Sequence, residues 1–223
     1  MTTRCNRYGN RVMPAQTYLV NVKSQLCHDG FVDKACFDYY LTRLLHCLNV
    51  FHVDLHAYCL LPRDVFLLIT PGVSEGPSLL LDRLNGCYSE YFNARFFRYK
   101  RVWRSRINFS LVQSRALILD CQKYIERLPL AEQYTKHPGA YSWSSYCSNS
   151  FGINSPYLTA HRSYQKFVQH NGNQYRGYRD FVATPFHSEY EDYLDSRLRF
   201  GLALAKRQYQ PVTPVATKRL RYA

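Results

Sequence analysis

The chain has 223 residues, a length that predicts one domain with an extension or two small domains. Hydrophobic residues make up 46% of it, which is enough for a buried core and excludes a wholly disordered chain. Lysine and arginine number 29 against 16 acidic residues, so the formal net charge is +13 and the expected partner is a polyanion, above all nucleic acid. The chain lacks the run of about 18 apolar residues that a transmembrane helix needs, so no membrane partner is expected.

The first part of the chain predicts a strand, a helix, two strands and a second helix. Their ranges, in that order, are 17–22, 34–50, 53–60, 64–70 and 78–92. Asp33 stands where a helix N-cap is needed. Strict alternation over VDLHAYCL predicts a strand with Val53, Leu55, Ala57 and Cys59 on one face. Only Leu61-Pro62-Arg63 separates this strand from the next, so the two form an antiparallel hairpin.

The second part predicts a fourth strand over 107–112 and a helix over 115–128, which Ser114 caps and Pro129 ends. Short tyrosine-rich helical pieces follow over 156–182. Ser188 and Glu191 have the spacing of a capping box that opens a last helix, whose apolar stripe continues to Ala205.

The order β-α-β-β-α-β of the first six elements is that of a ferredoxin-like α+β fold. It consists of a four-stranded antiparallel sheet with helices on one face, followed here by a helical C-terminal extension. The predicted organisation is a flexible basic lead-in over 1–14, the ferredoxin-like domain over 15–150, the extension over 151–206 and a basic, disordered tail over 207–223.

The segment 95–106 (RFFRYKRVWRSR) combines six positive charges with four aromatic rings. Cations neutralise phosphates and aromatic faces stack on unpaired bases, so this alternation favours contact with single-stranded or distorted nucleic acid. The candidate contacts are Arg95, Arg98, Lys100, Arg101, Trp103, Arg104 and Arg106. The alternative is a solvated loop whose aromatic rings, Trp103 first among them, pack on the domain.

Two further groups of residues could take part in chemistry. Asp64 and Phe66 share one face of a strand, where a carboxylate could bind a divalent cation but a phenyl ring could not. Tyr124 lies on the apolar stripe of the third helix, and a tyrosine hydroxyl can attack a phosphodiester. From the residues alone, Tyr124 is indistinguishable from a core tyrosine. His52 and His56 lie too far apart along a strand to share a metal ion.

Several segments resemble the REP-associated tyrosine transposases, which are single-strand DNA transposases of the HUH class. HAYCLLPRDVFLLITP (56–71) resembles their HAYVLMPNHVHLLLTP segment. Four more stretches match in order: Tyr91-Phe92-Asn93 with Arg95 resembles YFNRR, VWRSRINFSLV (102–112) resembles LWEGRFKSSLV, CQKYIERLP (121–129) resembles CRYIELNP, and YSWSSY (141–146) resembles YRWSSY. The resemblance spans roughly residues 12–205.

The resemblance implies a ferredoxin-like nuclease domain that binds folded single strands and cuts them with a helix-borne tyrosine. In the family, a divalent metal on a histidine pair activates the scissile phosphate. Tyr124 falls on the nucleophile position, but the two histidines fall on Asp64 and Phe66. The asparagine before the pair falls on Arg63, and a polar residue four positions after the tyrosine falls on Leu128. Metal binding at Asp64 is therefore expected to be weak or absent, and Arg63 is expected to hold a phosphate.

These observations predict a transposase-like protein that binds single-stranded or hairpin DNA and lacks metal-dependent cleavage, with no cofactor. One alternative is an active tyrosine transposase that forms a 5′-phosphotyrosine through Tyr124 with Mg²⁺ or Mn²⁺. Another is an RNA-binding or protein-interaction module on the same fold. The expected location is the cytoplasm of a bacterium, at the nucleoid, and both a monomer and a homodimer remain open.

Overall fold

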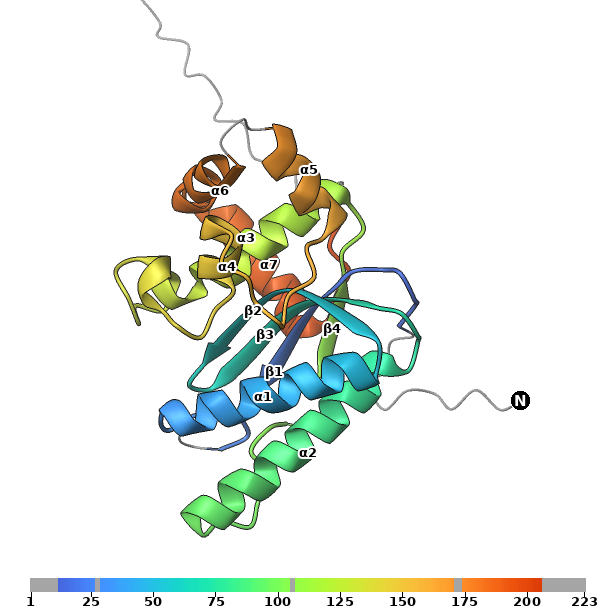
Figure 1. Ribbon diagram of the computed structural model, residues 1–223, viewed down its shortest axis with the longest axis vertical. Coiled ribbons are helices and arrows are strands. Elements are labelled where there is room, and N and C mark those ends of the chain that lie inside the picture. Colours follow the sequence, from blue (N-terminus) through green and yellow to red (C-terminus); the bar gives the residue numbers. More distant parts are fainter. Residues whose placement is uncertain (1–11, 27–28, 105–106, 171–173, 206–223) are drawn as a thin grey trace, which may run out of the picture.

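A four-stranded antiparallel sheet forms the centre of the computed structural model, which describes residues 12–26, 29–104, 107–170 and 174–205 (Figure 1). The strand order is β2-β3-β1-β4. The strands are β1 Tyr18–Lys23, β2 Val53–Leu61, β3 Asp64–Pro71 and β4 Asn108–Leu111. The helices are α1 Lys34–Val50, α2 Gly76–Phe96, α3 Arg115–Ala131, α4 Tyr146–Phe151, α5 Arg162–His170, α6 Gln174–Ala183 and α7 Ser188–Phe200, and a short 3₁₀ turn spans Pro138–Ala140. This order and topology confirm the predicted ferredoxin-like α+β fold.

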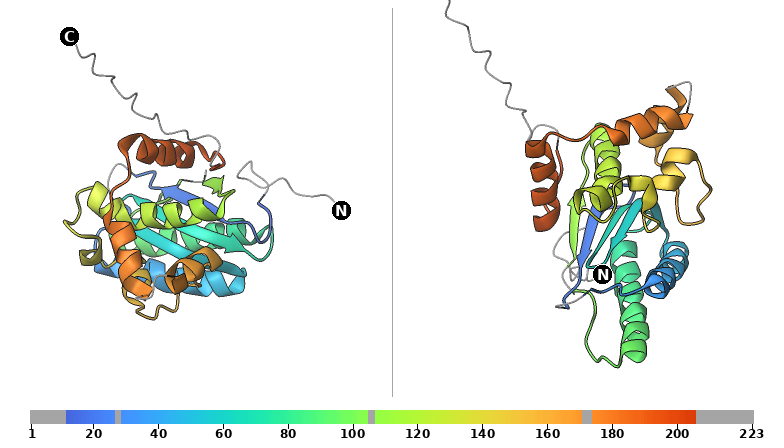
Figure 2. Two further views of the ribbon diagram at one scale, coloured as in Figure 1. Left: turned by 90° about the horizontal axis from the view of Figure 1, so that it is seen from above. Right: turned by 90° about the vertical axis from the view of Figure 1, so that its left-hand side faces the viewer.

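Helices cover both faces of the sheet (Figure 2). The first two helices, α1 and α2, pack on the face predicted for them, against inward side chains such as Val20 and Leu67. The opposite face also carries apolar side chains, among them Leu19 and Leu68, and α3 and α7 bury these. Because β1 and β3 are apolar on both sides, the sheet needs both helical layers. In the described part of the chain, no helix is long and apolar enough to cross a membrane.

A β-bulge in β2 interrupts the predicted alternation. Leu55 pairs with Ile69 and Ala57 with Leu68, so His56 is an extra residue in this strand. Residues before the bulge face α1 and α2, whereas Ala57 and Cys59 face α3. The predicted single face over 53–59 is therefore wrong. The buried His56 ring is satisfied by the Thr159 carbonyl at 2.7 Å and the Thr70 hydroxyl at 2.8 Å.

Some helix ends lie where the sequence predicts them, and others do not. The Asp33 carboxylate accepts from the backbone N–H of Cys36 at 3.1 Å, which confirms the predicted cap of α1. Pro129 lies inside α3 rather than beyond it, two residues before the last helical residue, and its carbonyl accepts from the Tyr134 N–H at 2.9 Å. The predicted capping box of α7 is absent, since the N-cap is His187 and Ser188 is already helical. The predicted tail, and the predicted lead-in up to residue 11, lie outside the described residues.

Glu126 of α3 joins the sheet domain to the helices that follow it. Its buried carboxylate accepts hydrogen bonds from the Ser145 hydroxyl at 2.8 Å, the Asn149 amide at 2.7 Å and the Tyr178 hydroxyl at 2.8 Å. Burial raises the pKa of Glu126 to about 7, against the opposing effect of these three donors. The carboxyl group thus links α3 to α4 and α6, across the predicted domain boundary after residue 150.

Glu126 should make the stability of the fold depend on pH between its unfolded and folded pKa values. A carboxyl group whose pKa is raised in the folded state stabilises the fold below its unfolded pKa, and this contribution is lost as the pH rises through the folded value. The free energy of unfolding should therefore fall between pH 4.5 and about 7. Denaturant titrations across this range should show the fall in the wild type and in Glu132→Gln, which removes an exposed carboxylate. A slope that persists unchanged in Glu126→Gln would contradict the assignment.

Candidate nucleic-acid interface

Three segments that are distant in sequence meet at the C-terminal end of β1. The Ser24 N–H donates to the Arg63 carbonyl at 2.8 Å, and the Arg104 N–H donates to the Lys23 carbonyl at 2.8 Å. The Gln25 N–H donates to the Val102 carbonyl at 2.9 Å. The end of β1 therefore lies between the β2–β3 turn and the chain that leads into β4. Lys23, Arg63 and Arg104 become neighbours through these bonds, and we call them the basic edge.

The side chains of the basic edge reach solvent, and the Lys23 ammonium group also lies 4.0 Å from the Asp64 carboxylate. Arg63 and Arg104 are exposed, and Lys23 is 41% exposed. One guanidinium nitrogen of Arg63 donates to the Leu26 carbonyl at 3.1 Å, which orients the group without neutralising it. Lys23 was not predicted from sequence. The antiparallel register of β1 with β3, which pairs Lys23 with Asp64, is the signal that could have found it.

The predicted basic segment divides into a structural part and an exposed part. Arg95 forms a two-pronged ion pair with Asp33, at 2.9 and 2.6 Å, and it also contacts the Tyr91 hydroxyl at 3.1 Å. The hydrogen bonds from Arg95 hold the pKa of Asp33 below its usual value. Arg95 thus ties the C-terminal end of α2 to the cap of α1. The exposed cations that follow it are Arg98, Lys100, Arg101 and Arg104, while Arg106 lies outside the described residues.

The aromatic rings of the segment divide in the same way. Phe97 is 85% exposed and Tyr99 is 94% exposed, so both present open ring faces to solvent. Trp103 is only 2% exposed and packs against Phe31 and Tyr88, with ring centroids 4.9 and 5.7 Å away. Trp103 is therefore a packing anchor, and its indole forms part of a pocket wall rather than an open stacking platform.

The Tyr124 side chain lies on the other helical face of the sheet and is buried. It is 4% exposed, and its hydroxyl donates to the Asp195 carboxylate of α7 at 3.5 Å. Burial, reinforced by the nearby Asp195 charge, raises the pKa of Tyr124. Both effects oppose formation of the phenolate. Phe66 and Leu128 belong to the same apolar cluster, so the surroundings of this tyrosine are largely hydrocarbon.

The residues around Asp64 do not fit a divalent metal ion. The Asp64 carboxylate accepts from the Asn21 amide at 3.2 Å and lies 4.0 Å from the Lys23 ammonium group. Phe66, the next residue on this face of β3, has no donor atom for a metal. Among the residues that the structure describes, no group of three or more histidine, cysteine or acidic side chains could hold a metal ion. The cation beside the Asp64 carboxylate is the Lys23 ammonium group.

The comparisons with known proteins support the fold. No family model matches the chain, and no curated protein matches it. Among solved structures, a REP-associated tyrosine transposase bound to a REP hairpin is similar, with a TM-score of 0.57 and 12% sequence identity. The match covers 72% of this chain and 93% of that one. At this identity the likeness shows a shared fold.

The ion pair of Arg95 predicts a division of roles among neighbouring arginines. Arg95→Ala should lower the free energy of unfolding, because Asp33 would lose its partner, whereas Arg98→Ala should leave it unchanged. Asp33→Ala should cost about 1 kcal/mol, the usual loss for a helix N-cap. Denaturant unfolding of the three variants checks the order. Equal stability of Arg95→Ala and Arg98→Ala would show that the pair is dispensable.

Proposed function

We propose that this protein binds single-stranded or hairpin DNA as a transposase-like DNA-binding protein, without metal-dependent cleavage. The observation that carries the proposal is the basic edge. Three cations from separate segments, Lys23, Arg63 and Arg104, are brought together by main-chain hydrogen bonds at one end of the sheet. Main-chain bonds fix where each side chain begins, so the cations are arranged for a polyanion before it binds.

The chemistry beside the basic edge favours unpaired or distorted DNA over regular duplex. Phe97 and Tyr99 offer exposed ring faces, and Arg98, Lys100 and Arg101 lie between and beyond them. Bases in a regular duplex already stack on one another, so open rings of this kind gain most from bases that are free to stack. The whole chain carries a net charge of +13, which adds an attraction that does not depend on sequence.

The expected loss of cleavage follows from the surroundings of Tyr124 and Asp64. Strand cleavage by a tyrosine needs a deprotonated or activated hydroxyl and a means of neutralising the charge that develops on the phosphate. Tyr124 is buried beside a carboxylate, and Asp64 is paired with Lys23. Arg63 and Lys23 can hold a phosphate by charge-assisted hydrogen bonds without supplying a Lewis acid. This arrangement allows DNA binding without strand cleavage.

The structural likeness is consistent with this proposal. The similar transposase was solved with a REP hairpin, and it shares the fold that positions the basic edge here. We infer a hairpin or single-stranded ligand for this chain from its own cations and exposed rings, together with that shared fold. The alternative of an active tyrosine nuclease has support from the position of Tyr124 on α3, but not from its burial.

Removing one cation of the basic edge should weaken DNA binding in a salt-dependent way. For Lys23→Ala, Arg63→Ala and Arg104→Ala, the slope of log K against log salt should fall by about one each, because each cation neutralises about one phosphate. The measurement is fluorescence anisotropy with a labelled DNA hairpin over a series of salt concentrations. A plain duplex of the same length should bind more weakly than the hairpin.

Arg43→Ala is the matched control for these variants, since Arg43 is an exposed arginine of α1 outside the basic edge. It should leave the slope unchanged. The proposal is wrong if Arg63→Ala behaves like Arg43→Ala, or if hairpin and duplex bind equally. Preference for an RNA hairpin of the same sequence would favour the RNA-binding alternative.

Binding should also be independent of divalent cations. Because the residues around Asp64 do not fit a metal, Mn²⁺ should not raise the melting temperature, and a chelator should not change affinity for the hairpin at constant ionic strength. Thermal melts and anisotropy with and without Mn²⁺ check this. A metal-dependent rise in the melting temperature that disappears in Asp64→Asn would restore a metal site.

A further inference from the structure

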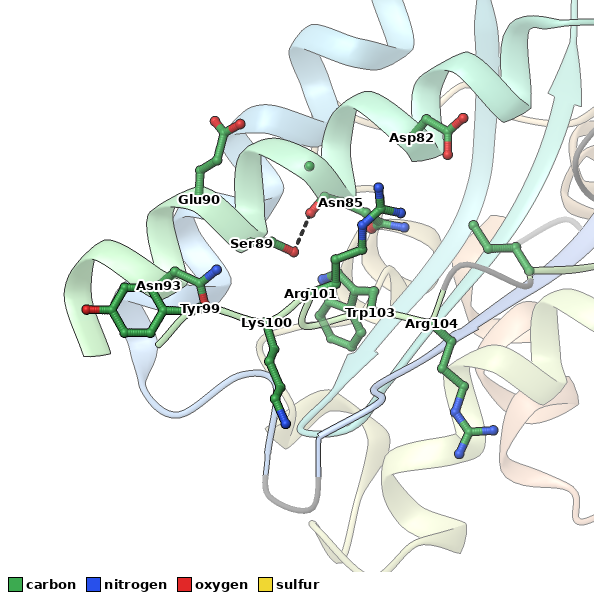
Figure 3. A pocket seen from close by; sticks show the side chains of 12 residues that line it. Asp82, Asn85, Ser89, Glu90, Asn93, Tyr99, Lys100, Arg101, Trp103 and Arg104 are labelled. Atoms are coloured by element: carbon green, nitrogen blue, oxygen red, sulfur yellow. Dashed lines mark hydrogen bonds between the residues drawn. The ribbon is translucent and has the colours of Figure 1, made fainter. Parts of the chain in front are cut away.

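Pockets near the two ends of the sheet differ in their chemistry. The pocket in Figure 3 adjoins the basic edge and carries the cations Lys100, Arg101 and Arg104. A second pocket, of about 350 Å³, lies where α1 ends and β2 begins, with residues 156–159 as its far wall, and we call it the α1-end pocket. Because β1 and β2 both pair antiparallel with β3, they run in the same direction, and the start of β2 lies at the opposite end of the sheet from the basic edge.

Hydrogen bonds hold the far wall of the α1-end pocket against β2. The Thr159 N–H donates to the Leu55 carbonyl at 2.8 Å, and the Thr159 carbonyl accepts from His56 Nδ1 at 2.7 Å. The ring of Tyr157 meets the ring of Tyr58 edge-on, with centroids 6.2 Å apart. The wall is therefore in place before a ligand binds, and the pocket volume is within the usual range for small-molecule sites.

The end of α1 makes this pocket electrically negative. The last carbonyl groups of a helix have no partner within the helix, and they carry the negative end of its dipole. Cations stabilise that position, but α1 has no basic residue in its last turn. The exposed Asp54 carboxylate also lines the pocket, and in the described part of the chain it forms no ion pair. A chain with a net charge of +13 thus leaves this pocket without a cation of its own among the described residues.

His52 adds a hydrogen-bonding side chain to the pocket at a position where glycine is usual. Its φ of 53° is in the left-handed region that the residue after a helix often adopts. The His52 carbonyl accepts from the Gly72 N–H at 2.8 Å, which fixes the turn from α1 into β2. The backbone conformation does not require a side chain here, yet the exposed imidazole lines the pocket and offers it a nitrogen acceptor.

The rest of the lining suits a hydrocarbon chain rather than a hydrated metal ion. Leu45, Leu48 and Val53 supply an apolar surface, and Tyr157 adds an aromatic ring, which attracts cations. A divalent ion needs several oxygen ligands, whereas the pocket has one carboxylate, and the described residues contain no metal-binding group of three histidine, cysteine or acidic side chains. An organic cation with a methylene chain matches both the charge and the apolar surface.

We propose that the α1-end pocket binds an alkylammonium ion, which is either a free polyamine or a lysine side chain of a partner protein. The ammonium group donates hydrogen bonds to the Asp54 carboxylate and to the carbonyl groups at the end of α1, and its methylene chain packs on Leu45 and Leu48. This inference goes beyond the proposed DNA binding and does not depend on it, because the pocket and the basic edge lie at opposite ends of the sheet.

Isothermal titration calorimetry of the full chain without DNA tests this site at low ionic strength. The probe is butane-1,4-diamine, and butane-1,4-diol is its uncharged counterpart. The wild type should bind the diamine but not the diol. Asp54→Asn removes the charge with little change of shape and should weaken diamine binding about tenfold. Its melting temperature should stay that of the wild type, because Asp54 is exposed.

Asp192→Asn is the matched control, since it removes an exposed carboxylate of α7, which packs on the other face of the sheet. It should keep the wild-type affinity for the diamine. N-acetyl-lysine methylamide separates the two sources: tighter binding of this compound supports a partner's lysine, and tighter binding of the diamine supports a free polyamine. The inference is overturned if the wild type binds neither amine, if the diol binds as well as the diamine, or if Asp54→Asn binds the diamine as tightly as Asp192→Asn does.

Discussion

The end of strand β1 is the constraint on which the candidate interface depends. β1 has a partner on each side, with β3 paired along Tyr18–Lys23 and β4 paired along Tyr18–Asn21. Past Lys23 the chain continues to hydrogen bond in both directions, to the β2–β3 turn and to the segment before β4. The positions of the basic edge, of the pocket wall formed by residues 99–104 and of Trp103 all follow from these few bonds. A change that displaces Ser24 or Gln25 would therefore move all three together.

The opposite helical face of the sheet surrounds Tyr124 with apolar side chains. Phe66 and Leu128 join the same buried cluster as Tyr124, and α7 covers that cluster. Burial favours the neutral phenol, so the packing that stabilises the fold opposes ionisation of Tyr124. The molecule then has two distinct regions, a buried tyrosine on one face and an exposed cationic edge at the end of the sheet. Of the two, only the second presents charged side chains to solvent.

Much of the fold follows from local signals in the sequence. The range of α1 and its cap at Asp33 are as predicted, because helical spacing and capping depend only on near neighbours. The bulge at His56 differs from the prediction, because the histidine ring finds a partner in distant Thr159. The continuation of α3 through Pro129 also differs, because a proline is tolerated near a helix end. Contacts between distant residues also limit how much of the candidate site the sequence predicts. A count of charges finds the segment 95–106, but the ion pair of Arg95 and the contribution of Lys23 depend on contacts between remote parts of the chain.

We propose that this protein binds DNA without cutting it, and one assay tests this proposal directly. End-labelled hairpins are incubated with the protein and Mn²⁺, and the same samples are resolved on a native gel for complexes and on a denaturing gel for nicks and covalent adducts. We expect a shifted complex with neither a nick nor an adduct. A nick or an adduct that forms with the wild type and disappears in Tyr124→Phe would show that the buried tyrosine acts as a nucleophile. That result would contradict the proposal that this protein binds DNA without cutting it.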